Sequence, residues 1–342
     1  MGFPALRHPI VLAPLAGGPS TPALAAAVTN AGGLGFVAGG YLSAKGLDER
    51  IHETRALTDG LIGVNLFHLR PAPVDEAVIA AYAADLEPEA RERGVVLGEP
   101  AFDDDGWEAK LAAVLDARVD VVSTTFGCPP VGVVRRLQEG GASVWITVGS
   151  LSEARAARTA GADAIVLQGA EAGGHRASWD DADGADVPSL ELLRAAAAEI
   201  ELPLVATGGI ADGAGIAAAL ESGARAAQLG TAFLLCPEAG TYEAHRRALR
   251  AGGPTAVTRA FTGRRARGIV NAFMRRHPDA PSAYPHVHHL TAPLRAAARA
   301  AGDADGFNLW AGESFDRARA LPAGDLVELL AEELAANTAP RS

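Results

Sequence analysis

The stretch "PLVATGGIADGAGIAAALESGARAAQLGTAFLL", residues 203–235, contains one complete strand–helix–strand unit. The apolar runs 203–208 and 226–230 each predict a buried strand, because nearly every position is apolar rather than every second one. Between them, residues 213–224 have helical spacing and include Gly223, the residue type preferred just after a helix. The unit therefore predicts two parallel strands joined by a helix, as in α/β folds.

The same unit recurs along the chain. Six further apolar runs precede it, at residues 9–13, 34–39, 61–67, 119–126, 143–148 and 163–168. Helical stretches follow several of them, among them residues 21–33 and 151–162. Eight such units predict a (β/α)8 TIM barrel of the α/β class.

The barrel pattern ends near residue 236, where Arg-rich and His-containing segments begin. We expect residues 1–236 to form the barrel, completed by an amphipathic helix at 321–338, and residues 237–320 to form a smaller, mostly helical capping lobe. Residues 68–118 and 169–202 are longer gaps in the pattern. The first is acidic, and we expect a second small strand or a loop there.

Composition narrows the class of protein. The chain has 30 Lys and Arg against 41 Asp and Glu, a net charge of −11, which disfavours nucleic acid and anionic membrane surfaces as partners. Every apolar run is interrupted well before the roughly 20 residues that a membrane helix needs. The two cysteines lack metal-ligand or disulfide spacing, and no signal segment precedes the first strand. We therefore predict a cytoplasmic protein.

The active site of a parallel barrel lies at the carboxyl ends of its strands. At these positions glycine, amide and hydroxyl groups dominate, without paired carboxylates or a metal-ligand set. Gly208 and Gly209 follow the seventh strand, while Gly230 and Thr231 follow the eighth, where such barrels bind phosphate. Thr231 could also cap the next helix, and these glycines could simply permit tight turns.

Three other residues are candidates for the site. Asn65 and Gln168 end apolar strands, and a buried amide must find a partner, either a heteroaromatic ring or the neighbouring backbone. His175 follows the pair Gly173 and Gly174 and is the candidate acid or base. A structural histidine is the alternative interpretation.

Some motifs favour other interpretations. His286, His288 and His289 lack a carboxylate or cysteine at ligand spacing, so we predict a surface or inter-lobe role and no metal site. Residues 264–267 are expected in a solvated turn or as an anchor between lobes. Nothing in the sequence near Cys128 lowers its pKa, although this residue could face the pocket.

Several of these segments resemble the nitronate monooxygenase family, formerly called 2-nitropropane dioxygenases. They include "GVNLF" (63–67), "DAIVLQGAEAGGHR" (163–176), "PLVATGGIADG" (203–213), "AAQLGTAF" (226–233) and "LWAGES" (309–314), and the resemblance covers nearly the whole chain. It implies a TIM-like barrel that binds FMN and oxidises alkyl nitronates such as propionate 3-nitronate with O2 to a carbonyl product and nitrite.

The resemblance also implies roles for individual residues. Contacts to FMN would come from Asn65, Gln168, Gly173, Gly209, Gln228, Leu229, Gly230 and Thr231, with Gly208 beside them. His175 would be catalytic, as a base toward a neutral nitroalkane or, once protonated, as a partner for an anionic nitronate. His68, Cys128 and Glu313 depart from the family's usual residues and leave the substrate open.

Other functions remain open on the sequence alone. A flavin-dependent enoyl-ACP reductase or an NAD(P)H:quinone reductase of the same superfamily shares the glycine–glycine–histidine stretch. A barrel that binds FMN without catalysis is a more distant alternative, and a homodimer is compatible with the chain.

Overall fold

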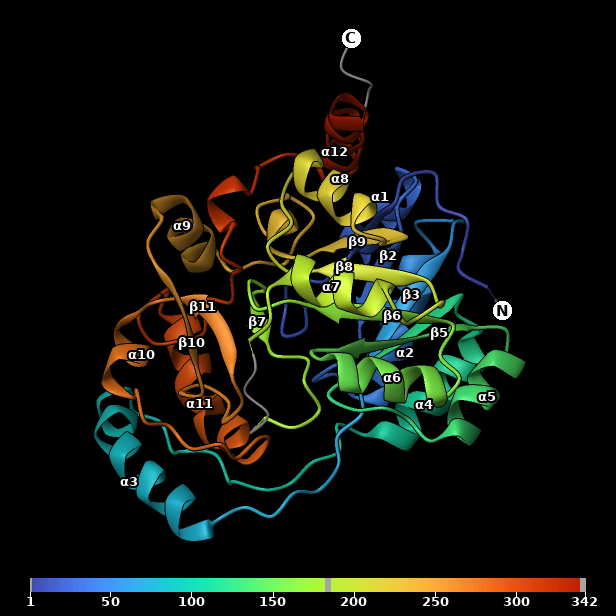
Figure 1. The fold of residues 1–342 in the computed structure, drawn as a ribbon. Helices are drawn as coiled ribbons and strands as arrows, with labels where there is room; N and C mark the ends of the chain where they lie inside the picture. Colours follow the sequence, from blue (N-terminus) through green and yellow to red (C-terminus); the bar gives the residue numbers. More distant parts are fainter. Residues whose placement is uncertain (1, 182–185, 339–342) are drawn as a thin grey trace.

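The computed structural model describes residues 2–181 and 186–338. Eight parallel strands form a nearly closed barrel in the hydrogen-bonded order β1-β9-β8-β6-β5-β4-β3-β2 (Figure 1). These strands are β1 (Ile10–Leu12), β2 (Gly35–Ala38), β3 (Ile62–Phe67), β4 (Val121–Thr125), β5 (Ser143–Val148), β6 (Ala164–Gln168), β8 (Leu204–Thr207) and β9 (Ala226–Leu229). A single bridge between Val11 and Leu34 links the first two strands. The predicted TIM barrel is confirmed.

The helices that cover the barrel follow the strands in sequence. They are α1 (Pro22–Asn30), α2 (Ala44–Arg55), α4 (Trp107–Ala117), α5 (Val131–Glu139), α6 (Leu151–Thr159), α7 (Ser189–Ala197) and α8 (Gly213–Glu221). Several begin at side-chain caps; the hydroxyl of Thr21, for example, accepts a hydrogen bond from the amide of Leu24. The strands are buried on both faces, which explains their near-continuous apolar sequence.

The interior of the barrel is a packed core. Phe36, Trp145 and Val166 are fully buried there, and the ring of Phe3 stacks on that of Trp145 at 5.0 Å. A filled interior leaves the carboxyl ends of the strands as the place where a ligand can bind.

A second lobe lies beside the barrel and is mostly helical, as predicted (Figure 1). Its elements are α9 (Glu243–Ala251), β10 (Thr255–Thr258), β11 (Ala266–Ile269), α10 (Ala272–Arg276) and α11 (His286–Ala300). It also contains an antiparallel sheet, β10-β11-β7, in which β7 is the pair Gly174–His175. The loop that carries His175 is thereby paired with the second lobe, with His175 opposite Ala266.

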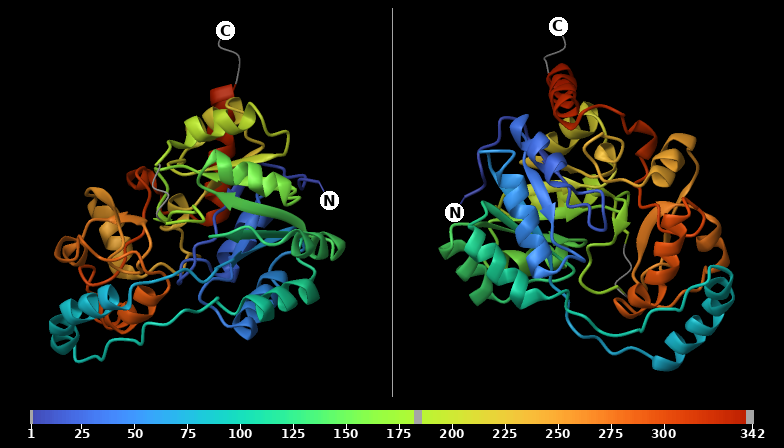
Figure 2. Two further views of the ribbon diagram at one scale, coloured as in Figure 1. Left: turned by 60° about the horizontal axis from the view of Figure 1, so that its bottom comes forward. Right: turned by 180° about the vertical axis from the view of Figure 1, so that it is seen from behind.

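The second small strand or loop expected in residues 68–118 is a loop, since residues 95–106 lie in no helix or strand. The sequence did not indicate the helix that precedes this loop. The segment forms a helix of 17 residues, α3 (Glu76–Glu92), followed by an irregular stretch and α4. Ile79 and Leu86 of α3 pack with Leu294 of α11, and α3 lies against the second lobe in both views of Figure 2. Pro88 inside the helix and its many exposed polar residues obscure the helical pattern in the sequence.

The last helix of the described residues packs on the barrel. Helix α12 (Ala323–Thr338) packs against α8 and α1, beside the junction of the first and last strands, while η1 (Thr231–Phe233) and η2 (Phe315–Arg317) are short 3-10 turns. Within the described ranges, no helix has the length and apolarity needed to cross a bilayer.

Candidate active site

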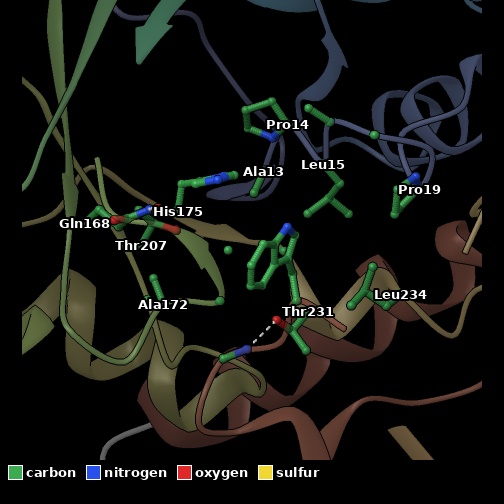
Figure 3. A pocket seen from close by; sticks show the side chains of 18 of the residues that line it. Ala13, Pro14, Leu15, Pro19, Gln168, Ala172, His175, Thr207, Thr231 and Leu234 are labelled. Atoms are coloured by element: carbon green, nitrogen blue, oxygen red, sulfur yellow. Dashed lines mark hydrogen bonds between the residues drawn. The ribbon is translucent and has the colours of Figure 1, made fainter. Parts of the chain in front are cut away.

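A hollow of about 1440 Å³, a volume that includes the open solvent at its mouth, lies at the carboxyl ends of the barrel strands (Figure 3). The loop after β1 (residues 13–17) and the strand ends form one side of it, and Trp310 and other residues of the second lobe complete it. Its lining includes Tyr41, Asn65, Phe126, Gln168, Gly173, His175, Gly208, Gly209, Gln228, Gly230, Thr231, Tyr242, His245, Arg299, Asn308, Gly312 and Ser314. Over the described residues this lining contains Arg299 but no carboxylate, which favours a neutral or anionic ligand.

Two glycines after β8 form a backbone cradle in this hollow. Gly208 and Gly209 have positive φ values of 112° and 72°, which favour glycine. A Cβ at Gly209 would also lie 2.9 Å from the Cβ of Glu171, so a side chain is excluded by packing as well. Both glycines line the pocket without a side chain, so their backbone provides the kind of surface that binds phosphate in such barrels.

Residues 311–314 cross over this cradle. The amide of Gly312 donates to Thr231 Oγ1 at 3.0 Å, and the hydroxyl of Ser314 donates to the carbonyl of Gly209 at 2.8 Å. Thr231 therefore fixes the crossing segment and makes no side-chain cap for η1, contrary to the suggestion from sequence. A Cβ at Gly173 would lie 2.5 Å from the carbonyl carbon of Ala311, so this glycine allows the loop to pack against the same segment.

The three predicted amides lie in the lining but make different contacts. Asn65 Nδ2 donates to Ser123 Oγ at 2.8 Å and to Thr125 Oγ1 at 3.0 Å, while its Oδ1 accepts no hydrogen bond from the described residues. Gln168 instead bonds the loop, donating to the carbonyl of His175 at 3.1 Å and accepting from the amide of Ala177 at 2.8 Å. Gln228 is buried at the end of β9. Gln168 thus holds the histidine loop in place.

His175 is half-buried in the lining, with its ring enclosed by aromatic side chains. The ring centroids of Trp310, Phe126 and Tyr284 lie 5.5 to 5.7 Å from its own, and its Nε2 lies 2.9 Å from Thr262 Oγ1. Trp310 and Tyr284 come from the C-terminal part of the chain, and no motif in the sequence linked them to His175.

Two buried arginines control the charge near His175. Arg264 lies over the ring of Phe126 at 4.3 Å, and Arg295 donates to the carbonyl of His288 at 2.7 Å. Neither forms an ion pair with a carboxylate in the part of the chain that the structure describes. Burial first, and then these two charges, lower the pKa of His175 to about 3. The lowered pKa favours the neutral imidazole, which is the form that can accept a proton.

A buried ion pair supports the rim of the pocket. Lys110 is 1% exposed, and its Nζ lies 2.6 Å from Asp105 Oδ2. The other carboxylate oxygen of Asp105 accepts a hydrogen bond from the amide of Tyr41 at 2.9 Å. Tyr41 has a φ of 67°, stacks on His288 at 4.4 Å and lines the pocket. The pair therefore fixes a strained rim residue.

Other predicted residues lie outside the lining. The side chain of Leu229 packs in the layer between the strands and helices α1 and α12, and His68 packs against Trp107. Cys128 is half-buried, and burial raises the pKa of its thiol. Glu313 pairs with Arg267 at 2.9 Å.

No potential metal-binding group of three His, Cys, Asp or Glu side chains is found in the described ranges. His288 contacts Tyr41 across the two lobes, in agreement with the predicted inter-lobe role. The lining also contains a histidine that the sequence did not reveal, His245 of α9. Its Nε2 has no hydrogen-bond partner among the described residues, and burial lowers its pKa to about 4.

The fold and the pocket define a (β/α)8 barrel with a ligand site at its carboxyl-terminal face. The model of the nitronate monooxygenase family matches residues 4–333. The chain belongs to this family.

Two curated nitronate monooxygenases are each 44% identical to the chain. The protein from Paraburkholderia phytofirmans is matched over 96% of this chain and 93% of its own length, and that from Pseudomonas aeruginosa over 96% and 97%. A solved structure of nitroalkane oxidase from Streptomyces ansochromogenes has a TM-score of 0.94 and 49% identity, covering 97% of each chain. FabK from Thermotoga maritima is similar at lower identity, 28%, with a TM-score of 0.77 and coverage of 97% and 94%.

Proposed function

We propose that this protein is a flavin-dependent monooxygenase that oxidises alkyl nitronates of the propionate 3-nitronate type with O2, giving a carbonyl product and nitrite. One observation carries the proposal. A glycine cradle suited to phosphate and a neutral imidazole line the same pocket, in a chain whose family and relatives act on such compounds.

FMN fits the residues present. Its phosphate would be held by the backbone of Gly208, Gly209 and Gly230 with Thr231 beside them, and its ring by Asn65 and Gln228, which line the pocket. Gly173 and Gln168 shape the loop next to it. When bound, the flavin supplies the electron acceptor that the side chains of this pocket lack.

The chain itself binds and orients the substrate. Arg264, Arg295 and Arg299 bring positive charge to this part of the molecule without carboxylate partners among the described residues, which favours an anionic nitronate. Phe126, Tyr284 and Trp310 restrict solvent around His175. With a neutral nitroalkane, His175 takes the proton from the α-carbon.

We also propose that the two lobes have different roles. Residues 1–236 with the helix at 321–338 form the flavin-binding barrel, and residues 237–320 form the lobe that covers the substrate. The packing of α12 on α1 and α8 supports the first assignment. The contacts of Tyr284 and Trp310 with His175 support the second.

The test is anaerobic mixing of the purified yellow protein with each electron donor. Propionate 3-nitronate should bleach the flavin absorbance rapidly, and admission of O2 should restore it with release of nitrite. Rapid bleaching by NAD(P)H, with none by the nitronate, would overturn the proposal in favour of a reductase. Binding of FMN without turnover of any nitronate would support a non-catalytic barrel.

A further inference from the structure

The imidazole of His175 has a single hydrogen-bond partner among the described residues. Its Nε2 lies 2.9 Å from Thr262 Oγ1, and Thr262 is 2% exposed, in the second lobe. Nδ1 accepts or donates no hydrogen bond within the described part of the chain, and the ring lines the pocket. The two nitrogens therefore have different surroundings, and the tautomer decides which of them can accept a proton.

The hydrogen-bonding needs of Thr262 select the tautomer. Its hydroxyl has one proton and two neighbours that can accept it: the carbonyl of Arg264 at 3.3 Å, which can only accept, and Nε2 of His175 at 2.9 Å. This carbonyl accepts no other hydrogen bond from the described residues. If the hydroxyl donated to Nε2 instead, the carbonyl would lose its donor, and Nδ1 would carry a proton with no acceptor among the described residues. Both losses are avoided when Nε2 carries the proton and donates it to Thr262.

We propose that Thr262 is a positioning residue that holds His175 as the Nε2–H tautomer, so that Nδ1 is the atom that accepts the substrate proton. Toward a neutral nitroalkane, the α-carbon–hydrogen bond breaks and the proton goes to Nδ1. The electron pair stays on the substrate, which becomes the nitronate, while His175 becomes an imidazolium. This inference rests on the proposed function only for the identity of the substrate.

Hydrogen bonds of the backbone at His175 and Arg176 hold the histidine in the position that this tautomer requires. The carbonyl of His175 accepts from Gln168, and the amide of Arg176 donates to the carbonyl of Arg265 at 2.9 Å. The Cα position is therefore fixed by β6 and by the second lobe. Thr262 supplies the remaining constraint, on the rotation and protonation of the ring.

The direct test is a proton–nitrogen correlation spectrum of the FMN-loaded protein with ¹⁵N-labelled histidine. A His175→Asn variant identifies the His175 signals among the nine histidines. We expect a protonated Nε2 and an unprotonated Nδ1 in the wild type, and a changed ratio in Thr262→Val. A proton on Nδ1 in the wild type, or the same spectrum in Thr262→Val, would overturn the proposal.

Kinetics provide the second test. Thr262→Val should lower kcat/KM for a neutral nitroalkane by about tenfold or more, and for the preformed nitronate far less, since only the former needs the base. Thr262→Ser keeps the hydroxyl and should restore the rate. Thr54→Val is the matched control: Thr54 is fully buried and donates to the carbonyl of Arg50 at 2.7 Å, away from the pocket.

The outcomes separate the two proposals. Equal losses for both substrates in Thr262→Val would mean a purely structural role and would overturn the inference. If Thr262→Val does not fold, the wild-type spectrum and the comparison with Thr262→Ser still decide the tautomer. If the wild type turns over neither substrate, the proposed function fails, and the spectrum still tests Thr262.

Discussion

Replacing Gly173 by Ala tests the role of the segment that crosses the glycine cradle. The new Cβ would lie 2.5 Å from the carbonyl carbon of Ala311 and 2.9 Å from its Cα, where ordinary contacts begin near 3.4 Å. The crossing backbone must therefore move by about 1 Å. The hydrogen bond from Gly312 to Thr231, now 3.0 Å, then lengthens beyond bonding distance.

The expected costs follow from these displacements. Overpacking costs about 1 to 3 kcal/mol and the lost hydrogen bond about 1 kcal/mol, so the free energy of unfolding should fall by about 2 to 4 kcal/mol. Because Gly312 and Ser314 line the pocket, the Kd for FMN should rise about tenfold, which corresponds to about 1.4 kcal/mol.

Urea unfolding of the apoprotein and fluorescence titration with FMN measure the two effects. Gly132→Ala is the control, because a Cβ there meets nothing within 4 Å and the residue lies in α5. It should leave FMN binding unchanged and stability equal or higher by up to about 1 kcal/mol. Wild-type stability and wild-type FMN affinity in Gly173→Ala would refute the reasoning.

Three further predictions concern single contacts. Asp105→Asn leaves the buried ammonium of Lys110 without a countercharge, so the free energy of unfolding measured in urea should fall by about 3 to 5 kcal/mol. Glu49→Gln, which breaks the exposed pair with Lys45, should lower it by under about 1 kcal/mol. Similar losses in the two variants would contradict this prediction. Because the pKa of His175 is lowered to about 3, the native state binds fewer protons than the unfolded chain between that value and the ordinary 6.5. The stabilisation linked to this group is complete above pH 6.5 and is lost as the pH falls toward 3. In His175→Asn the free energy of unfolding should therefore decrease less steeply with falling pH than in the wild type. Identical slopes of the free energy of unfolding against pH in the two proteins would count against the lowered pKa. Thr231→Val removes the hydroxyl that accepts the hydrogen bond from Gly312 and should raise the Kd for FMN about fivefold, while Thr231→Ser keeps this hydroxyl and should leave the Kd unchanged. Equal Kd values for the two variants would exclude this role of Thr231.

Strand positions in the barrel could be predicted from the sequence because burial acts on both faces of every strand. The run that became β5 is buried at all six positions, and such runs stand out without any knowledge of tertiary contacts. The glycines after β8 could also be predicted, because the carboxyl end of a barrel strand is where a ligand binds and glycines there indicate close approach of the backbone. Helix α3 could not be recognised, because Pro88 and its exposed residues weaken the periodicity.

The residues of the second lobe that surround His175 could not be predicted from the sequence. Thr262 and Trp310 meet this histidine only because a two-residue strand joins its loop to the second lobe, and two residues carry no periodic signal. One reason for glycine at position 173 was hidden for the same reason. A Cβ there would meet the backbone near Ala311, far along the chain, although Gly173 also lines the pocket.

The position of the crossing segment in the chain affects the order of events during synthesis. All eight strands are complete at Leu229, but the residues from Phe307 to Ser314 that close the pocket, and the helix α12 beside the strand junction, are translated last. When the eighth strand has been synthesised, one wall of the pocket and the helix α12 are therefore still missing. A product truncated before residue 307 would lack both.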